Sequence, residues 1–298
     1  MITKTNEVMP EQPVIVLLYG VPGSGKTSVA TTANKPLVID TDRGAKRAVK
    51  RVDTIFANNW DDILADINSG AFKDYKTIIL DTAKSCLDDY ISEYVVRQDF
   101  KLKKNTLKRF GAMGDEFKNF VNAIRANGTD IIFICHDKET QEGDIIRHAP
   151  DCTGQSKNLL VRIADQVGYV SYINGTRVIN CGPMDCFETK NTAEFPIMEI
   201  PEYNTSEFEH FMADFIQGVK DRIISRDSAQ KEAHDKLDSL RSQLSEANSD
   251  ETISALMIGC KELPKPMQMP FFSEMKETLA TKGWSWSDEE KRFIKTAA

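Results

Sequence analysis

The sequence predicts an α/β fold, a mostly parallel sheet covered by helices on both faces, and three observations support this prediction. Apolar segments that suit buried strands alternate with amphipathic helical segments up to residue 135. A glycine-rich loop joins the first of these strands to the first helix. The dipeptide Asn174-Gly175 joins two β-rich segments, which indicates antiparallel strands at one edge of the sheet.

The glycine-rich loop, residues 20–28, reads GVPGSGKTS and fits the phosphate-binding pattern G-x-x-x-x-G-K-[ST]. Glycines let successive backbone N–H groups point at a polyphosphate, and a helix that starts near Lys26 directs its positive end at the same anion. We expect Lys26 to reach the β- and γ-phosphates and Thr27 to hold Mg²⁺. The sequence therefore predicts that ATP or GTP binds here. The predicted nucleotide-binding residues are Gly20, Val21, Pro22, Gly23, Ser24, Gly25, Lys26, Thr27 and Ser28.

The remaining elements of the core follow from hydrophobic periodicity. After a first strand at 13–19, further strands are predicted at residues 36–40, 75–81, 129–135, 166–174 and 176–180. Helices are predicted at residues 28–33, 60–67, 86–95, 117–126 and 207–219. These elements define a core at residues 13–218, after a flexible tail at 1–12.

Three acids and one histidine follow the predicted strands, and carboxyl ends of parallel strands converge on the ligand crevice. Asp81 ends the strand TIILD, where a carboxylate engages Mg²⁺ through water. Asp42 follows the second strand and is the expected base for an attacking water, unless it belongs to a solvated turn. Asp40 is either a second such carboxylate or a cap of the strand end. His136 follows the fourth strand, where a polar side chain can contact the γ-phosphate.

Charge is distributed unevenly along the chain, whose formal net charge is −7. Residues 97–109 carry six cations against Asp99, and Phe100 and Phe110 flank them. One interpretation is a solvated basic helix face. The other, which we favour, is contact with single-stranded DNA, because cations bind phosphates and aromatic rings stack on bases. The predicted DNA-binding residues are Arg97, Lys101, Lys103, Lys104, Lys108, Arg109 and Phe110, with Arg147 from a long polar loop expected at 138–157.

The six cysteines show no disulfide framework, and we expect free thiols in a reducing cytoplasm. A zinc set of His148, Cys152, Cys181 and Cys186 is not predicted, because its spacings match no paired-cysteine knuckle. No apolar run approaches the about 20 residues that a membrane span needs, and the N-terminus lacks a signal-peptide core. The sequence thus predicts a cytoplasmic protein with no membrane partner.

The segment at residues 219–298 is predicted to form a small helical region. Within it, a helix at 221–248 carries apolar residues at alternating spacings of four and three, namely Ala233, Leu237, Leu240, Leu244 and Ala247. This seam suits either a short coiled coil or an amphipathic helix that packs on its own domain.

The order of these parts resembles the RecA-type ATPase core, in which a phosphate loop, a catalytic acid, a Mg²⁺-site aspartate, a first DNA loop, a γ-phosphate sensor and a second DNA loop follow one another. The matching segments are GVPGSGKT, LVIDTD, TIILDT, the basic segment up to Gly114, a helix at 115–126, IIFICH and residues 138–157. More closely, GVPGSGKT, LVIDTDRG and IILDTA are similar to a phage-borne group of short RecA-like proteins, taken to be single-strand annealing proteins or recombinases. The resemblance covers roughly residues 13 to 200.

This resemblance implies catalytic roles for Lys26, Asp42, Asp81 and His136, with ATP as the nucleotide and Mg²⁺ held by Thr27 and Asp81. Asp42 stands where this family usually has a glutamate, which implies slow turnover, and His136 stands where it usually has a glutamine. Lys157 or Arg162 would reach the γ-phosphate of a neighbouring protomer in a ring or filament.

Three functions follow as hypotheses. The first is an oligomeric ATP-dependent protein that binds and anneals single-stranded DNA in phage-type homologous recombination, in the host cytoplasm if it is phage-encoded. The second is a kinase for small molecules such as nucleotides. The third is a non-catalytic nucleotide switch that recruits a partner such as a single-strand DNA-binding protein.

Overall fold

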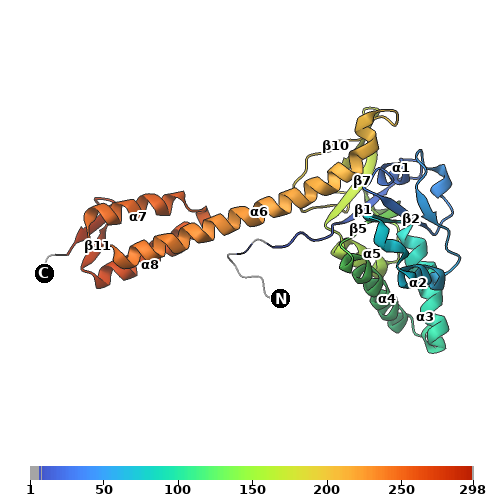
Figure 1. The fold of residues 1–298 in the computed structure, drawn as a ribbon, viewed down its shortest axis with the longest axis horizontal. Helices are drawn as coiled ribbons and strands as arrows, with labels where there is room; N and C mark the ends of the chain where they lie inside the picture. The colour runs from blue at the N-terminus through green and yellow to red at the C-terminus, as the bar shows by residue number, and fades with distance from the viewer. Residues whose placement is uncertain (1–6, 8, 297–298) are drawn as a thin grey trace. The chain divides into compact units, whose positions relative to one another are not determined.

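The structure is a computed structural model that describes residues 7 and 9–296. The chain divides into two compact units, Glu11–Arg222 and the residues from Ile223 onward together with the described residues before Glu11. One long helix, α6 (Ser206–Glu246), contributes its first part to one unit and its second part to the other (Figure 1). The sequence placed the boundary at residues 218 and 219, a few residues earlier.

The first unit is built on a ten-stranded sheet. Its main path is β10 (Met198–Glu199), β8 (Thr176–Asn180), β7 (Gln166–Ile173), β1 (Ile15–Gly20), β5 (Asp130–Glu142), β4 (Thr77–Asp81), β2 (Pro36–Asp40) and β3 (Asp53–Ile55). From β7 to β3 all neighbours are parallel, whereas β8 and β10 are antiparallel. Two further strands, β6 (Ile145–Pro150) and β9 (Lys190–Asn191), pair antiparallel with β5 and β7. The predicted mostly parallel sheet with an antiparallel edge is confirmed.

Helices cover both faces of this sheet, which explains why its central strands are apolar without interruption. Alternate side chains of β1 pack into two different hydrophobic clusters. Ile15 and Leu17 belong to a cluster with residues of α2 (Trp60–Ser69), α3 (Ser92–Gln98), α4 (Thr106–Ala126) and α5 (Gly154–Ile163). Val16 and Leu18 belong to a second cluster with α1 (Lys26–Ala30) and the first part of α6 (Figure 1).

Short helical turns complete this unit. They are the 3₁₀ helices Ala45–Arg47, Ala71–Asp74 and Phe100–Lys103 and a π-helical segment at Ser85–Ile91.

The basic segment at 97–109 is helical, so the predicted first DNA loop is wrong in its backbone form. A 3₁₀ turn at Phe100–Lys103 leads into α4, which begins at Thr106 rather than near residue 115. The Asn105 side chain accepts a hydrogen bond from the Lys108 backbone N–H and caps this helix. Gly111 and Gly114 do not end the helix, because the apolar face that contains Met113 and Phe117 is buried around them.

The segment at 138–157 is not a loop either. β5 continues to Glu142, and the chain then turns at Gly143, which has a left-handed conformation (φ 63°). The chain returns as β6, which pairs with β5 over six residues. The antiparallel ladder satisfies the backbone hydrogen-bonding groups of this polar segment, so its polarity does not require a loop. A short connection then leads to α5, which already begins at Gly154.

The second unit has its own buried core. The second part of α6 packs with α7 (Asp250–Glu262), α8 (Lys265–Thr281) and a hairpin of β11 (Trp284–Ser287) and β12 (Arg292–Lys295). Leu240, Leu244 and Ala247 of the predicted seam lie in this core, so the seam packs within its own unit. The two helices expected at 207–219 and 221–248 are one continuous helix, and the sequence analysis missed the hairpin. Among the described residues, no helix has both the length and the apolar character to cross a membrane.

Candidate nucleotide-binding site

Strands β1, β2 and β4 end beside a pocket, and β5, which lies between β1 and β4, runs past it. The parallel register places Asp40 beside Asp81, and Gly20 beside His136. The pocket has a volume of about 460 Å³. It is lined by Pro22, Gly23, Gly25, Lys26, Thr27, Ser28, Asp42, Gly44, Arg47, Ala48, Val49, Asp81, Thr82, Ile134, His136 and Tyr203. The structure thus brings together the four predicted catalytic residues and most of the predicted phosphate loop.

The loop conformation depends on glycine at several positions. Gly23 and Gly25 have φ values of 81° and 88°, in the left-handed region that side chains rarely adopt. At Gly20, a Cβ atom would lie 2.4 Å from the carbonyl oxygen of Val170 on β7, so a larger residue would displace the neighbouring strand.

Lys26 lies across the loop from which it arises. Its ammonium group donates to the carbonyl oxygens of Gly20 at 2.8 Å and Val21 at 2.9 Å. Burial lowers the pKa of Lys26, and the nearby Asp81 carboxylate partly opposes that shift. Protein groups therefore balance only part of the positive charge of Lys26. This charge lies at the mouth of the loop, where the phosphates of a nucleotide would bind.

Thr27 and Asp81, which are predicted to hold Mg²⁺, are in direct contact with each other. The Thr27 hydroxyl donates to Asp81 Oδ2 at 2.7 Å, and Asp81 is 6% exposed. Burial, followed by the charges of Asp40 and Asp42, raises the pKa of Asp81 to about 6. A hydroxyl and a carboxylate are ligands that Mg²⁺ prefers, and a dication would offset the excess of carboxylate charge. The residues present fit Mg²⁺.

The two acids after β2 have different environments. Asp40 is fully buried, and its two oxygens accept from the backbone N–H groups of Gly44 and Ala45, both at 2.9 Å. It therefore caps the turn that follows the strand. Asp42 is exposed and lines the pocket, and its Oδ2 accepts from the Thr82 hydroxyl at 2.9 Å. Of the two, Asp42 is the carboxylate in a position to orient a water molecule.

His136 lies in the middle of β5 and lines the pocket. Its Nδ1 atom is buried and has no hydrogen-bond partner among the described residues. Burial and the positive charge of Lys26 lower its pKa and so favour the neutral imidazole. A neutral imidazole with an unpaired nitrogen is suited to hydrogen-bond a phosphate oxygen.

Three further residues at the pocket were not predicted from the sequence. Arg47 lines the pocket from the 3₁₀ turn after Asp40, and Tyr203 lines it from the segment before α6. The Arg177 guanidinium on β8 lies 4.2 Å from the centre of the Tyr203 ring, next to Gly25. The predicted hairpin at Asn174-Gly175 contained Arg177, but no sequence signal places that hairpin beside the phosphate loop.

The two residues predicted to act on a neighbouring protomer do not line this pocket. Lys157 forms an ion pair with Glu188 at 2.8 Å, and Arg162 lines a small cavity beside α4 together with Phe110. Their proposed roles concern another copy of the chain and stay predictions.

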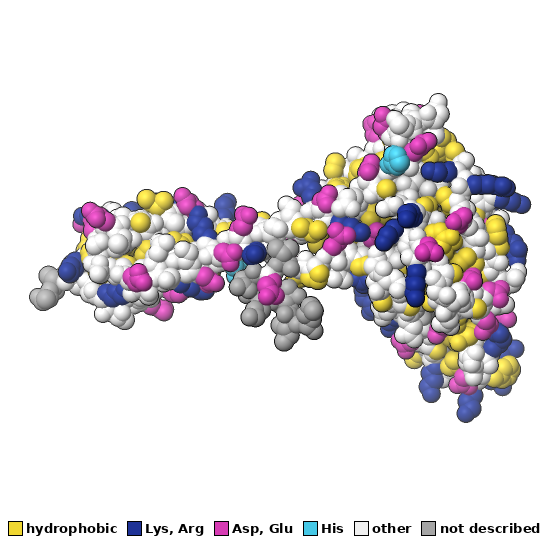
Figure 2. All heavy atoms as spheres, viewed as in Figure 1, with side chains coloured by type: hydrophobic (Ala, Val, Ile, Leu, Met, Phe, Trp, Pro, Cys, Tyr) yellow, Lys and Arg dark blue, Asp and Glu magenta, His cyan; other side chains and the backbone are white. Residues whose placement is uncertain are grey.

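Seven of the eight predicted DNA-binding residues gather where α3, the 3₁₀ turn and α4 meet, a surface that we call the basic tip. It comprises Arg97, Lys101, Lys103, Lys104, Lys108, Arg109 and Phe110. Figure 2 shows Lys and Arg side chains clustered at this end of the unit. Arg97 pairs with Asp61, and Lys103 lies 5.4 Å from the centre of the Phe100 ring. The eighth residue, Arg147, lies on β6, where it bonds to Glu142 at 2.5 Å.

Comparison with known proteins agrees with this geometry. A protein-family profile described as an AAA domain matches residues 12–193, the segment that carries the phosphate loop, Asp42, Asp81 and His136. A search of curated proteins finds no significant match. The profile covers more than half of the 298 residues, including every pocket-lining residue except Tyr203. The chain therefore belongs to the AAA domain family, with a nucleotide-binding domain of the P-loop NTPase type.

Proposed function

We propose that this protein is an ATP-binding, slowly hydrolysing ATPase that binds single-stranded DNA and anneals it in homologous recombination of the phage type. The observation that carries the DNA part is the basic tip, which concentrates cations in a chain of net charge −7. The nucleotide part rests on the pocket at the strand ends and on the family.

Each of the following pocket residues has a separate role in the ATPase reaction. Lys26 binds the β- and γ-phosphates. Thr27 and Asp81 would hold Mg²⁺, which would supply neutralising charge to the transferring phosphoryl group. Asp42, oriented by the Thr82 hydroxyl, accepts a proton from the attacking water. His136 hydrogen-bonds the γ-phosphate. Turnover is slow because an aspartate reaches less far toward the water than a glutamate would.

The basic tip has the chemistry of a single-strand binding surface. Lys101, Lys104 and Lys108 are exposed and no ion pair involves them within the described residues. Phe100 is 69% exposed and offers a ring for base stacking, an interaction worth about 1–3 kcal/mol per base. A solvated basic helix face would not require an exposed aromatic ring among the lysines, and this favours the DNA interpretation.

Helix α4 supports a link between DNA and nucleotide. The basic tip includes its first turn, and Phe117 farther along the helix packs against Phe133 of β5 with ring centres 5.4 Å apart. β5 runs past the pocket, where it carries His136. DNA that orders the basic tip would thus act on α4. This helix packs against β5, the strand that carries His136 and its contact with the γ-phosphate.

The decisive experiment replaces Lys101, Lys103 and Lys104 together by alanine. Single-stranded DNA affinity, measured by fluorescence anisotropy at several salt concentrations, should fall, and the slope of log K against log salt should decrease by about 2. DNA stimulation of ATP hydrolysis and strand annealing should fall in parallel. The matched control replaces Lys261, Lys265 and Lys295, exposed lysines of the second unit, and should leave all three readouts unchanged.

Three results would contradict the proposal. Normal DNA binding by the tip variant would show that the lysines only solvate a helix. Phosphate transfer to a nucleoside by the wild type would favour the kinase. Nucleotide-dependent partner binding without turnover would favour the switch.

The proposed annealing protein acts as a ring or filament in which Lys157 or Arg162 contacts a neighbour's γ-phosphate. Electron microscopy with an ATP analogue and single-stranded DNA tests this assembly. Alanine at Arg162 should lower DNA-stimulated hydrolysis while leaving ATP binding to the isolated protomer intact, because Arg162 does not line the pocket.

A further inference from the structure

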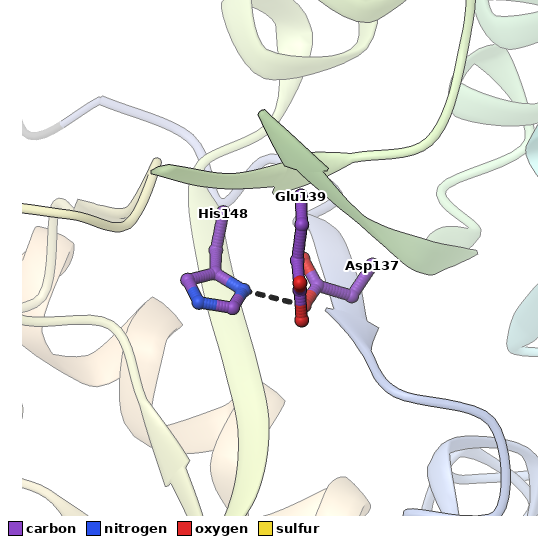
Figure 3. A group of neighbouring side chains, drawn as sticks. All are labelled: Asp137, Glu139 and His148. Atoms are coloured by element: carbon purple, nitrogen blue, oxygen red, sulfur yellow. Dashed lines mark hydrogen bonds and ion pairs between the residues drawn. The ribbon is translucent and has the colours of Figure 1, made fainter. Parts of the chain in front are cut away.

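The base of the β5–β6 hairpin carries three potential metal ligands on one face. The two-residue period of a strand places Asp137 and Glu139 on the same side of β5, and the register sets His148 opposite Glu139. Figure 3 shows the two carboxyl groups together, with the His148 ring facing them. One ligand atom from each residue lies within 4.8 Å of the other two.

The Asp137 side chain is buried, but its hydrogen bonds within the described residues satisfy only one of its two carboxylate oxygens. Its side chain is 2% exposed, and its Oδ2 forms a hydrogen bond with His148 Nδ1 at 2.6 Å and accepts from the Tyr169 hydroxyl at 3.3 Å. Its Oδ1 is buried without a hydrogen-bond partner in the described part of the chain. An unsatisfied buried acceptor is costly, and more so on a charged group. A cation between the three side chains would satisfy it.

The surroundings indicate an excess of negative charge at this point. The cluster holds two carboxylates, those of Asp137 and Glu139, and a single imidazole. A dication beside two carboxylates and a neutral imidazole would bring the local charge to zero.

His148 is held in place by the segment that follows β8. Its backbone N–H donates to the Cys186 carbonyl at 2.7 Å, and its carbonyl accepts from the Glu188 N–H at 3.0 Å. Its ring stacks on Phe187, with ring centres 4.3 Å apart and planes 5° from parallel. Such support orients a ligand before the metal arrives, as is usual for metal-binding histidines.

We propose that Asp137, Glu139 and His148 form a binding site for a divalent transition-metal ion, with Zn²⁺ as the representative of the class. Zinc ligands at about 2.0–2.2 Å from a tetrahedral ion are separated by about 3.3 Å, so the group needs only a modest contraction. Glu139 is exposed and free to make that movement. The imidazole ligand distinguishes this site from the all-oxygen site of Thr27 and Asp81, which suits Mg²⁺.

The test is calorimetric titration of the full chain with Zn²⁺ in the presence of excess Mg²⁺, which occupies the oxygen site. We expect one bound Zn²⁺ per chain. Glu139→Gln and His148→Gln should each weaken Zn²⁺ affinity at least about tenfold. The matched control is Asp144→Asn, which removes the same charge from the exposed turn of the same hairpin and should bind Zn²⁺ like the wild type.

Co²⁺ in place of Zn²⁺ provides a second readout, since thiolate ligands produce an intense near-ultraviolet band that nitrogen and oxygen ligands do not. The proposed site predicts visible Co²⁺ absorption without that band. The proposal is overturned if Glu139→Gln and Asp144→Asn bind Zn²⁺ equally, or if the Co²⁺ spectrum shows cysteine ligation. Circular dichroism and unchanged ATP binding establish that Glu139→Gln is folded, since Glu139 lies outside the nucleotide pocket.

Discussion

At the scale of single residues, the nucleotide pocket holds charge that is balanced only when a ligand is present. Asp81 and Lys26 are both buried, and burial shifts the pKa of each toward its neutral form. Asp40 and Asp42 add negative charge beside them. Such opposed shifts within one cleft are typical of functional sites, because a site built for a charged ligand leaves part of its own charge uncompensated.

Asp81→Asn should stabilise the ligand-free protein at neutral pH. The folded-state pKa of about 6 lies above the model-peptide value of 3.8, so ionised Asp81 destabilises the fold above pH 6. This cost is up to about 3 kcal/mol at pH 7.5 and declines to about a third of that at pH 4.5, as the folded state takes up a proton. Urea unfolding of both proteins at the two pH values measures the difference. A gain that does not shrink at pH 4.5 would contradict the assigned pKa.

Lys26→Ala should weaken ATP binding by about 10- to 100-fold, since a hydrogen bond to a charged group contributes about 1.5–3 kcal/mol. Titration with a fluorescent ATP analogue measures the loss. Lys76→Ala is the control, because this exposed lysine precedes β4 at the opposite end of the strand from the pocket. Equal affinities for the two variants would remove Lys26 from the phosphate site.

At the scale of elements, capping and tertiary burial decided where helices begin. Helix α4 extends through two glycines because its apolar face is buried, and Asn105 caps its first turn. Helix α7 begins with a reciprocal capping box, in which Ser249 and Thr252 each accept a hydrogen bond from the other's backbone N–H. The same local chemistry thus sets helix boundaries in both units.

Ser249→Ala should lower the free energy of unfolding of the second unit by about 1 kcal/mol, the usual loss for a removed helix cap. Urea unfolding followed by the fluorescence of Trp284 and Trp286 measures it. Ser242→Ala serves as the control, because Ser242 is exposed within α6 and alanine there is neutral or slightly stabilising. Equal behaviour of the two variants would show that the capping box contributes nothing.

At the scale of the whole molecule, the chain contains two units with separate buried cores. The pocket and its flanking clusters belong to the first unit, while the third cluster belongs to the second. A ligand stabilises the part of a protein that binds it, by about 2.7 kcal/mol when its concentration is 100 times its dissociation constant.

Calorimetric unfolding should therefore show two transitions. Mg²⁺ with an ATP analogue should raise the midpoint temperature of only one of them. The Trp60→Phe variant identifies them, since its remaining tryptophans, Trp284 and Trp286, report on the second unit alone. Their fluorescence transition should not move when the nucleotide is added. A single transition that shifts as a whole would show that the two units unfold together.

The sequence was sufficient for the fold class and for much of the pocket. The phosphate loop, the strand end at Asp81, the polar His136 after an apolar run, and the hairpin at Asn174-Gly175 all depend on contiguous residues. Backbone geometry and side-chain periodicity encode such features locally, and parallel strands bring their carboxyl ends together in any sheet of this class.

Other features were decided by tertiary structure alone. The helical basic tip, the position of Arg177 and Tyr203 beside Gly25, and the group of Asp137, Glu139 and His148 all result from long-range packing or strand register. Register between distant segments is set by how buried faces fit together, which no local pattern records. The sequence by itself therefore determined that this protein has a phosphate loop in an α/β core, whereas its folding determined which side chains surround that loop.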